Sequence, residues 1–142
     1  MSLTKARTRI LGSILGCVIA VAPGNAQADP SDGIDWHIRG TVQGPMGEDL
    51  PLREGIHDDR TWGSGFGVRH IEEGHGYLPS LSEIEEGIRQ SKECGNGLPD
   101  GDQKVVCNSE LQGHKFRVVV TQRVDNRCPD GRPVGIITAF FE

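Results

Sequence analysis

The last third of the chain carries the longest runs of β-branched and aromatic residues. KFRVVVTQRV (residues 115–124) and VGIITAFFE (residues 134–142) are typical of strands, and QKVVCN (residues 103–108) is a shorter one. Asp130 and Gly131, in the segment CPDGRP, are typical of a turn between the last two strands. The pattern predicts an antiparallel β-meander over the C-terminal part of the chain.

Apolar residues at helical spacing precede this meander. FGVRHIEE (residues 66–73) predicts a short helix that ends at Gly74, because glycine is common just after a helix. PSLSEIEEGIRQSKE (residues 79–93) predicts a second helix with one apolar face and a capping box on either Ser80 or Ser82. Two short helices therefore come before the strands.

Residues 29–62 contain glycine or proline every few positions, which interrupts any long element. One short strand fits around DWHIRGTVQ (residues 35–43). We therefore expect an irregular, acidic N-terminal arm over residues 29–62, followed by one domain over residues 63–142. The predicted fold class is α+β, with short N-terminal helices followed by an antiparallel β-meander packed on them.

The first 28 residues have the three parts of a secretory signal peptide. MSLTKARTR carries three basic residues and no acid, ILGSILGCVIAVA is an apolar run, and PGNAQADP supplies a small-x-small end. The apolar run is shorter than the roughly 20 residues of a membrane-spanning helix. We expect cleavage after Ala28, secretion to the cell envelope or the medium, and no stable membrane association afterwards.

Removal of residues 1–28 makes the chain more acidic. It leaves 12 of the 15 basic residues against all 20 acidic ones, so the formal charge becomes −8, which is 12 minus 20. This charge argues against long-range steering onto nucleic acid. Residues 115–132 are the exception, with five basic residues against two acidic ones, so one side of the folded surface can still be positive.

Three cysteines remain after Cys17 leaves with the signal peptide. In an oxidising compartment they form at most one intramolecular pair. Cys94 and Cys107 flank a short loop, and we expect them to form the disulfide, which leaves Cys128 free or paired between chains. A zinc site on the three cysteines is the competing interpretation, although they contain no CxxC spacing.

The stretch GSGFGVRHIEEGHGY (residues 63–77) places two histidines between glycines. His70 and His75 lie about 140° apart around a helix, whereas a helical zinc pair needs a spacing of four residues. If Gly74 ends the helix, the two imidazoles project from different local frames and can face one substrate from two sides, as general acid–base catalysis requires. The competing interpretation is a half-buried helix residue and an exposed loop residue. The other histidines have no such context, and we assign them to the surface: His37, His57 and His114.

Together with the strands, these residues resemble a known family. FGVRHIEEGHG, a helix, KFRVVVT and the terminal GIITAFFE are similar to the metal-independent RNase toxins of the barnase/EndoU/colicin/RelE (BECR) class, over roughly residues 62–142. In that class a histidine in an RHI-type helix precedes a sheet, and the last strand often carries a threonine followed by a small and an aromatic residue. The resemblance assigns catalytic roles to His70, His75, Arg117 and Thr138.

The resemblance implies a definite chemistry. Such an enzyme cleaves RNA through the 2′-hydroxyl, leaves a 2′,3′-cyclic phosphate, and uses no metal or other cofactor. His70 and His75 would move the two protons, while Arg117 and Thr138 would stabilise charge on the phosphoryl oxygens. Besides the RNA substrate, an immunity or inhibitor protein is the expected partner.

Two other classes of function stay open at the level of sequence. In the first, the protein is a secreted binding module whose histidines are incidental, a role that suits the acidic N-terminal arm. In the second, it is an exported metal-binding protein that uses His70 and His75 together with Glu72 or Glu73.

Overall fold

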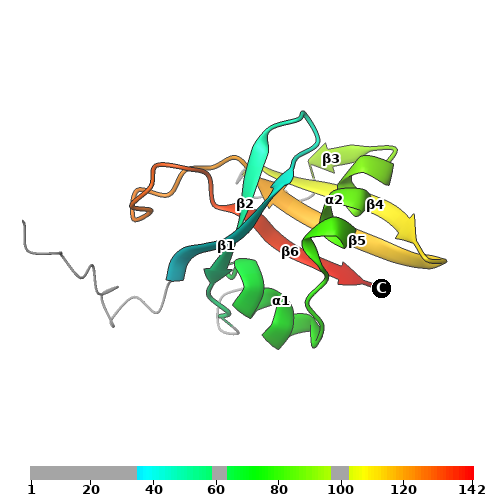
Figure 1. Ribbon diagram of the computed structural model, residues 1–142, viewed down its shortest axis with the longest axis horizontal. Helices are drawn as coiled ribbons and strands as arrows, with labels where there is room; N and C mark the ends of the chain where they lie inside the picture. The colour runs from blue at the N-terminus through cyan, green and yellow to red at the C-terminus, as the bar shows by residue number, and fades with distance from the viewer. Residues whose placement is uncertain (1–34, 59–63, 97–102) are drawn as a thin grey trace, which may run out of the picture.

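A computed structural model describes residues 35–58, 64–96 and 103–142 of the chain (Figure 1). The predicted signal peptide, residues 1–28, lies outside these residues. Within them, no helix has both the length and the apolar character needed to cross a membrane. The described part of the chain is mostly β-structure.

Strands and helices follow one another in the described residues in this order: β1 (Asp35–Gln43), β2 (Asp49–Gly55), α1 (Gly67–His75), α2 (Leu81–Gln90), β3 (Cys94–Asn96), β4 (Lys104–Leu111), β5 (His114–Thr121) and β6 (Gly135–Phe141). β1 and β2 form a two-stranded hairpin sheet, and the other strands form a four-stranded sheet in the order β3-β4-β5-β6. All pairs are antiparallel. β6 therefore lies at one edge of the larger sheet.

The predicted fold class, with short N-terminal helices followed by a meander, is wrong. The described chain begins with the β1–β2 hairpin, which packs on the same core as the helices and the larger sheet. The glycines and prolines that suggested an irregular arm have other roles. Gly47 takes the positive φ of the hairpin turn, and Pro51 is tolerated because it lies in a two-stranded sheet. A Cβ at Gly40 would overlap the Leu81 side chain, so this glycine allows α2 to approach β1.

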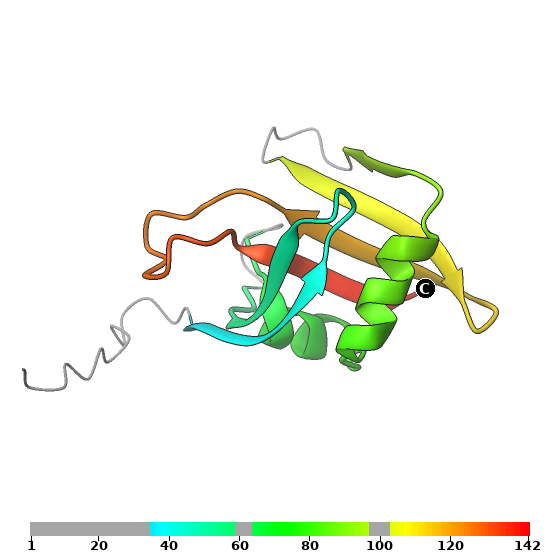
Figure 2. The same ribbon diagram turned by 45° about the horizontal axis from the view of Figure 1, so that its top comes forward.

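The main core lies between one face of the four-stranded sheet and a layer made of the hairpin and the helices. Figure 2 shows the hairpin and α2 in front of the larger sheet, with α1 beside β6. Gly87 of α2 lets the helix approach the sheet closely, because a Cβ there would overlap the ring of Phe116. The buried core includes Val42, Leu50, Leu52, Val68, Ile71, Ile84, Ile88, Phe116, Val118, Val120, Ile136 and Ala139.

Both predicted helices are present, but α1 ends later than expected. α2 begins with one of the two predicted capping boxes, in which the Ser80 hydroxyl accepts from the Glu83 N–H and the Glu83 carboxylate accepts from the Ser80 N–H. α1 continues through Gly74 and ends at Gly76, which has a φ of 75°. His75 is therefore the last residue of a helix rather than part of a loop.

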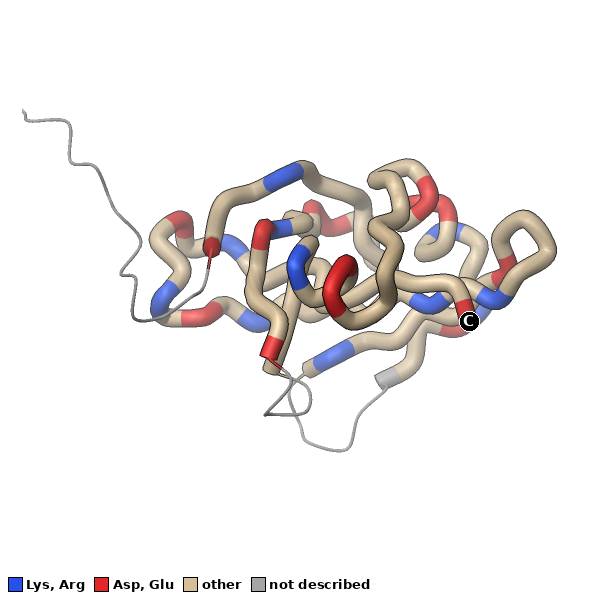
Figure 3. Tube along the Cα trace, turned by 90° about the horizontal axis from the view of Figure 1, so that it is seen from below, with Lys and Arg blue, Asp and Glu red and all other residues tan. Residues whose placement is uncertain are grey.

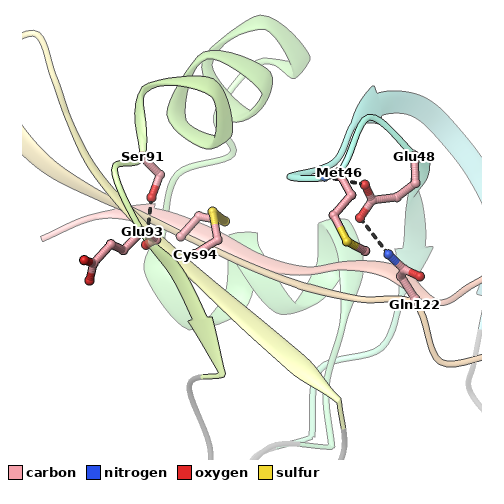
Figure 4. Close-up of a disulfide and its surroundings, with 7 residues drawn as sticks. Met46, Glu48, Ser91, Glu93, Cys94 and Gln122 are labelled. Atoms are coloured by element: carbon pink, nitrogen blue, oxygen red, sulfur yellow. Dashed lines mark hydrogen bonds between the residues drawn. A yellow bond between two sulfur atoms is a disulfide. The ribbon is translucent and has the colours of Figure 1, made fainter.

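The predicted disulfide is present at the edge of the larger sheet (Figure 4). Cys94 of β3 and Cys107 of β4 lie directly opposite each other, with Cα atoms 4.2 Å apart, and Cys128 is buried and free. In the same view the tip of the hairpin reaches the segment that follows β5, where Glu48 accepts a hydrogen bond of 2.9 Å from the Gln122 side chain. This contact ties the hairpin tip to the sheet.

Arg53 of β2 has a fully buried side chain, which is rare for arginine unless it is paired. Its guanidinium donates two hydrogen bonds to the Asp130 carboxylate, at 2.8 and 3.0 Å, and others to the carbonyls of Trp36 and Pro133. The Trp36 ring also lies against it, with the guanidinium carbon 5.6 Å from the ring centroid. One side chain therefore links β1, β2 and the loop that leads into β6.

We expect Arg53→Met to destabilise the protein by about 1.5–3 kcal/mol, because it removes the charged donor of the Asp130 carboxylate and of the Trp36 and Pro133 carbonyls. Arg39→Met is the matched control, since Arg39 pairs with Glu54 in the same hairpin but is 51% exposed. Its loss should cost about 0–1 kcal/mol. Urea unfolding of both variants measures the difference. Equal stabilities would show that Arg53 does not hold the hairpin to the rest of the fold.

Candidate active site

The four-stranded sheet has a second face, opposite the main core, and two cross-strand pairs of β5 and β6 define it. Arg117 lies opposite Phe140, and Val119 lies opposite Thr138. Because alternate residues of a strand point to the same side, these four side chains share one face, whereas Val118 points into the main core. We term the four residues the β5–β6 face.

His75 reaches the β5–β6 face from the end of α1. Its imidazole stacks on the Phe140 ring, with 3.9 Å between the centroids and 11° between the planes. The guanidinium carbon of Arg117 lies 5.8 Å from the centroid of the same ring. α1 runs alongside β6 (Figure 1), so it can bury Val68 and Ile71 in the main core while its last residue reaches the opposite face.

Two further histidines connect to His75. The ring centroids of His70 and His75 are 6.2 Å apart, and the rings are nearly perpendicular, at 87°. His57 lies in the connection between β2 and α1, and its Nδ1 atom is 3.3 Å from the Nδ1 atom of His70. This is a hydrogen-bond distance when one of the two nitrogens carries a proton. Three imidazoles from two segments therefore form one cluster beside the β5–β6 face.

A tight junction between β2 and α1 brings His57 to His70. Ile56 and Phe66 form an isolated antiparallel bridge, with N–H···O=C hydrogen bonds of 2.9 and 3.0 Å in the two directions. Gly65 leaves the space that the His70 imidazole occupies, since a Cβ there would overlap the ring. The bridge and this glycine together determine the contact between the two histidines.

Burial and neighbouring positive charge favour the neutral form of both helix histidines. Burial lowers the pKa of His70 below its ordinary value of 6.5, and the charges of His57, His75 and Lys104 lower it further. Burial also lowers the pKa of His75, with an additional contribution from His57. At pH 7 both imidazoles are therefore mainly neutral, which is the form that accepts a proton.

Arg117 is held by two side chains. Its guanidinium forms an ion pair of 2.6 Å with Glu142 and donates a hydrogen bond of 3.1 Å to the Asn108 side chain. These contacts orient the guanidinium beside Phe140. A phosphate at the β5–β6 face would meet a preoriented arginine, and it would compete with the Glu142 carboxylate for it.

Other basic residues around β5 are partly paired with acidic ones. Arg123 and Arg127, from the basic segment 115–132, both pair with Asp125. Figure 3 shows basic and acidic segments interspersed along the trace. Two arginines of this segment share one carboxylate, so the segment keeps an excess of positive charge, and Arg117 is the basic residue of the segment that lies on the β5–β6 face.

Thr138 has a buried hydroxyl without a partner. The residue is 7% exposed, and its Oγ1 atom makes no hydrogen bond with any described residue. Burying an unpaired hydroxyl costs about 1–3 kcal/mol, so such a group needs an explanation. Val119 opposite it and the neighbouring Ile137 belong to a second buried apolar cluster, so this hydroxyl is enclosed, and a ligand at the β5–β6 face would reach it only after neighbouring side chains move.

All four predicted site residues lie in or beside this region, but their geometry differs from the expectation. Because Gly74 does not end the helix, His70 and His75 share α1 and approach each other through the reach of their side chains. Two residues beside these four, Phe140 and His57, were not predicted from the sequence. The alternation of β6 could have indicated Phe140, whereas no local pattern could have indicated His57, because its position depends on the bridge between β2 and α1.

The metal-binding interpretation finds little support in these positions. The described residues contain no group of three or more His, Cys, Asp or Glu side chains arranged to hold a metal ion. Glu72 and Glu73, the carboxylates of that interpretation, are exposed on α1. The competing zinc site on three cysteines is wrong, because Cys94 and Cys107 are joined to each other.

Comparison with known proteins does not assign the chain to a family. No family model, no curated protein and no solved structure matches it. The resemblance to the BECR-class RNase toxins therefore stays a prediction, and function has to be inferred from the geometry of the site.

The lowered pKa values of His70 and His75 predict that stability falls on mild acidification. The unfolded chain takes up these protons near pH 6.5, whereas the folded protein takes them up only at lower pH, so the unfolded state binds more protons as the pH falls below about 6.5. Hydrogen bonds from arginines also lower the pKa of Asp125 and of Asp130. The stability that these carboxylates contribute is lost only below about pH 4.

Urea unfolding between about pH 7.5 and pH 5.5 isolates the histidine contribution. The double variant His70→Gln/His75→Gln lacks both groups and should lose less stability over this range than the wild type. An equal loss in the two proteins would show that the fold does not shield these histidines from protons.

Proposed function

We propose that the protein is a metal-independent endoribonuclease that cleaves RNA by attack of the 2′-hydroxyl on the neighbouring phosphorus. The observation that carries the proposal is the approach of His70 and His75 beside the β5–β6 face, where Arg117 and Thr138 lie next to Phe140. Two proton-transfer groups, one guanidinium and one hydroxyl donor are the set that this reaction uses.

The two histidines have complementary roles in the proposed reaction. Neutral His70, the more buried of the two, accepts the proton of the 2′-hydroxyl, and the resulting oxygen attacks phosphorus. The bond from phosphorus to the 5′ oxygen breaks, and protonated His75 gives its proton to that oxygen. The products are a 2′,3′-cyclic phosphate end and a 5′-hydroxyl end, with no net change in the number of protons.

Arg117 and Thr138 act on the phosphate in this proposal. Negative charge builds up on the phosphoryl oxygens as the 2′ oxygen attacks, and a guanidinium and a hydroxyl donor stabilise it. Arg117 is preoriented by Glu142 and Asn108, so little ordering is needed when the phosphate binds. The Thr138 hydroxyl is enclosed and has no partner among the described residues, so it would have to be uncovered as the phosphate binds before it can donate to it.

The acidity of the chain affects how RNA would bind. The full sequence has a formal charge of −5, so long-range attraction of a polyanion is not expected to drive binding. Affinity then comes from a few contacts at the site, and the salt dependence of binding should be shallow.

Export and an inhibitor belong to the same proposal. Residues 1–28 have the pattern of a signal peptide, so the enzyme would meet its RNA outside the cytoplasm of the producing cell. A cell that makes such a nuclease needs protection before export, and an immunity or inhibitor protein that covers the β5–β6 face would provide it.

Substitution of His70 tests the proposal. His70→Ala should reduce the rate of RNA cleavage in EDTA by about 10²–10⁴-fold, because it removes a general base. His75→Ala should have a similar effect, and Arg117→Ala and Thr138→Ala should fall between these variants and the wild type. His37→Ala is the matched control, since His37 is exposed on β1 and its loss should leave the rate unchanged. Circular dichroism checks that each variant is folded.

Two results would refute the nuclease proposal. The first is wild-type protein that leaves RNA intact both in EDTA and with added divalent metal ions. The second is a folded His70→Ala variant that cleaves RNA as fast as the wild type. In either case the secreted binding module becomes the better interpretation.

The lowered pKa values also predict an acidic optimum for cleavage. The active form needs neutral His70 and protonated His75, and burial lowers the pKa of both below 6.5. The fraction of enzyme in this form is therefore largest below about pH 6.5, and the rate should follow a bell-shaped curve with its maximum there. Initial rates from about pH 4.5 to pH 8 measure the curve. A maximum near pH 8 would mean that His75 is not the acid.

A further inference from the structure

We propose that His57 is a positioning residue for His70: the hydrogen bond between their Nδ1 atoms holds the His70 imidazole and leaves its Nε2 atom to exchange a proton with the substrate. The contact that carries this inference is the 3.3 Å distance between the two Nδ1 atoms. Its catalytic meaning rests on the proposed function, whereas the bond itself can be measured in the protein without RNA.

The bond sets the tautomers of both rings together. Two Nδ1 atoms can bond only when one carries a proton and the other offers a lone pair. In the neutral pair, one ring is therefore protonated at Nδ1 and the other at Nε2. For His70 Nε2 to accept the substrate proton, His70 must carry the Nδ1–H and donate it to the lone pair of His57 Nδ1, while His57 keeps its proton on Nε2. A first additional proton binds to Nε2 of the ring whose Nδ1–H donates, and this leaves the bond intact. A second proton binds to Nδ1 of the other ring, so that two Nδ1–H groups face each other and the bond is lost. The bond therefore survives the uptake of one proton and is lost with two.

Among the described residues, the charged groups that act on His70 are positive. His57 acts on it from the β2–α1 connection, His75 from the end of α1, and Lys104 from β4. The carboxylate closest to His57 in sequence, Asp58, accepts a hydrogen bond of 3.2 Å from the Ser64 hydroxyl.

The identity of the orienting group matters for catalysis. A carboxylate in the place of His57 would favour the protonated form of His70 and raise its pKa. An imidazole in this place orients the ring without that effect, so His70 stays a weak base. This agrees with the acidic optimum that the lowered pKa values of the helix histidines predict.

Packing supports the same orientation. The His57 and His70 ring centroids are 5.4 Å apart, with 37° between the planes. Gly74, one helical turn after His70, also lies near the His57 ring, since a Cβ there would be 3.5 Å from the His57 Cε1 atom, an ordinary contact distance. The His57 ring therefore packs on α1 beside both residues, and a smaller side chain would leave the His70 ring without this contact.

Nitrogen NMR of histidine-labelled protein reads the tautomer and the pKa of His70 directly. In the wild type, neutral His70 should show one fixed tautomer. In His57→Ala it should exchange between the two tautomers, and its pKa should rise toward 6.5. His57→Asn is the matched variant, because the asparagine amide occupies approximately the place of Nδ1 and can keep the bond. This variant should retain the wild-type tautomer.

The RNA-cleavage assay adds a second readout. His57→Ala should lower kcat by roughly 10- to 100-fold with little change in KM, because the base is misoriented while the binding contacts remain. The acidic limb of its pH–rate profile should move to higher pH, following His70. His57→Asn should recover most of the lost rate.

The outcomes separate this inference from the proposed function. An unchanged His70 tautomer and pKa in His57→Ala would overturn the inference, whatever the RNA assay shows. Wild-type protein without RNase activity would refute the proposed function, while the NMR result would still decide whether the bond exists. If His57→Ala does not fold, His57→Gln replaces it, because the glutamine amide lies near the place of Nε2 and cannot make the bond that Nδ1 makes. The same His70 tautomer in the glutamine and asparagine variants would then also overturn the inference.

Discussion

The buried guanidinium of Arg53 is the contact on which the arrangement of the site depends. It binds Asp130 and the Pro133 carbonyl in the loop that leads into β6, and the Trp36 carbonyl in β1. The carbonyl of Arg53 itself lies against the first residue of α1, because a Cβ at Gly67 would overlap it. A single residue of β2 therefore fixes the positions of β6 and of the start of α1. The cost of burying its charge is offset only while all these acceptors stay in place.

The proposed site lies between the two elements that Arg53 holds. β6 supplies Thr138 and Phe140, and α1 supplies His70 and His75. Neither element contains both the proton-transfer groups and the donors for a phosphate. A shift of about 1 Å between them would separate the His75 ring from its stacking partner, and displacements of this size cost roughly 100-fold in rate in enzymes that depend on orientation. Stability and function are thus coupled at Arg53, through its side chain toward β6 and through its backbone carbonyl toward α1.

The sequence predicted those features that depend on neighbours in the chain. The β-branched runs indicated strands, the Ser80 box indicated the start of α2, and the short loop indicated the pairing of Cys94. The first strand of the hairpin was predicted, but the second was missed, because Pro51 and Gly55 look like interruptions until Phe66, farther along the chain, packs against Gly55. The same limit applies to His57, whose contact with the helix histidines exists only after β2 and α1 have been joined by their bridge.

The direct test of the central claim is whether the RNA supplies its own nucleophile. The mature protein is incubated in EDTA with an RNA and with a fully 2′-O-methylated strand of the same sequence, and the products are identified by mass spectrometry. The proposed mechanism predicts that only the RNA is cut and that every new 3′ end is initially a 2′,3′-cyclic phosphate. Cleavage of the methylated strand, or new 3′-hydroxyl ends, would contradict it.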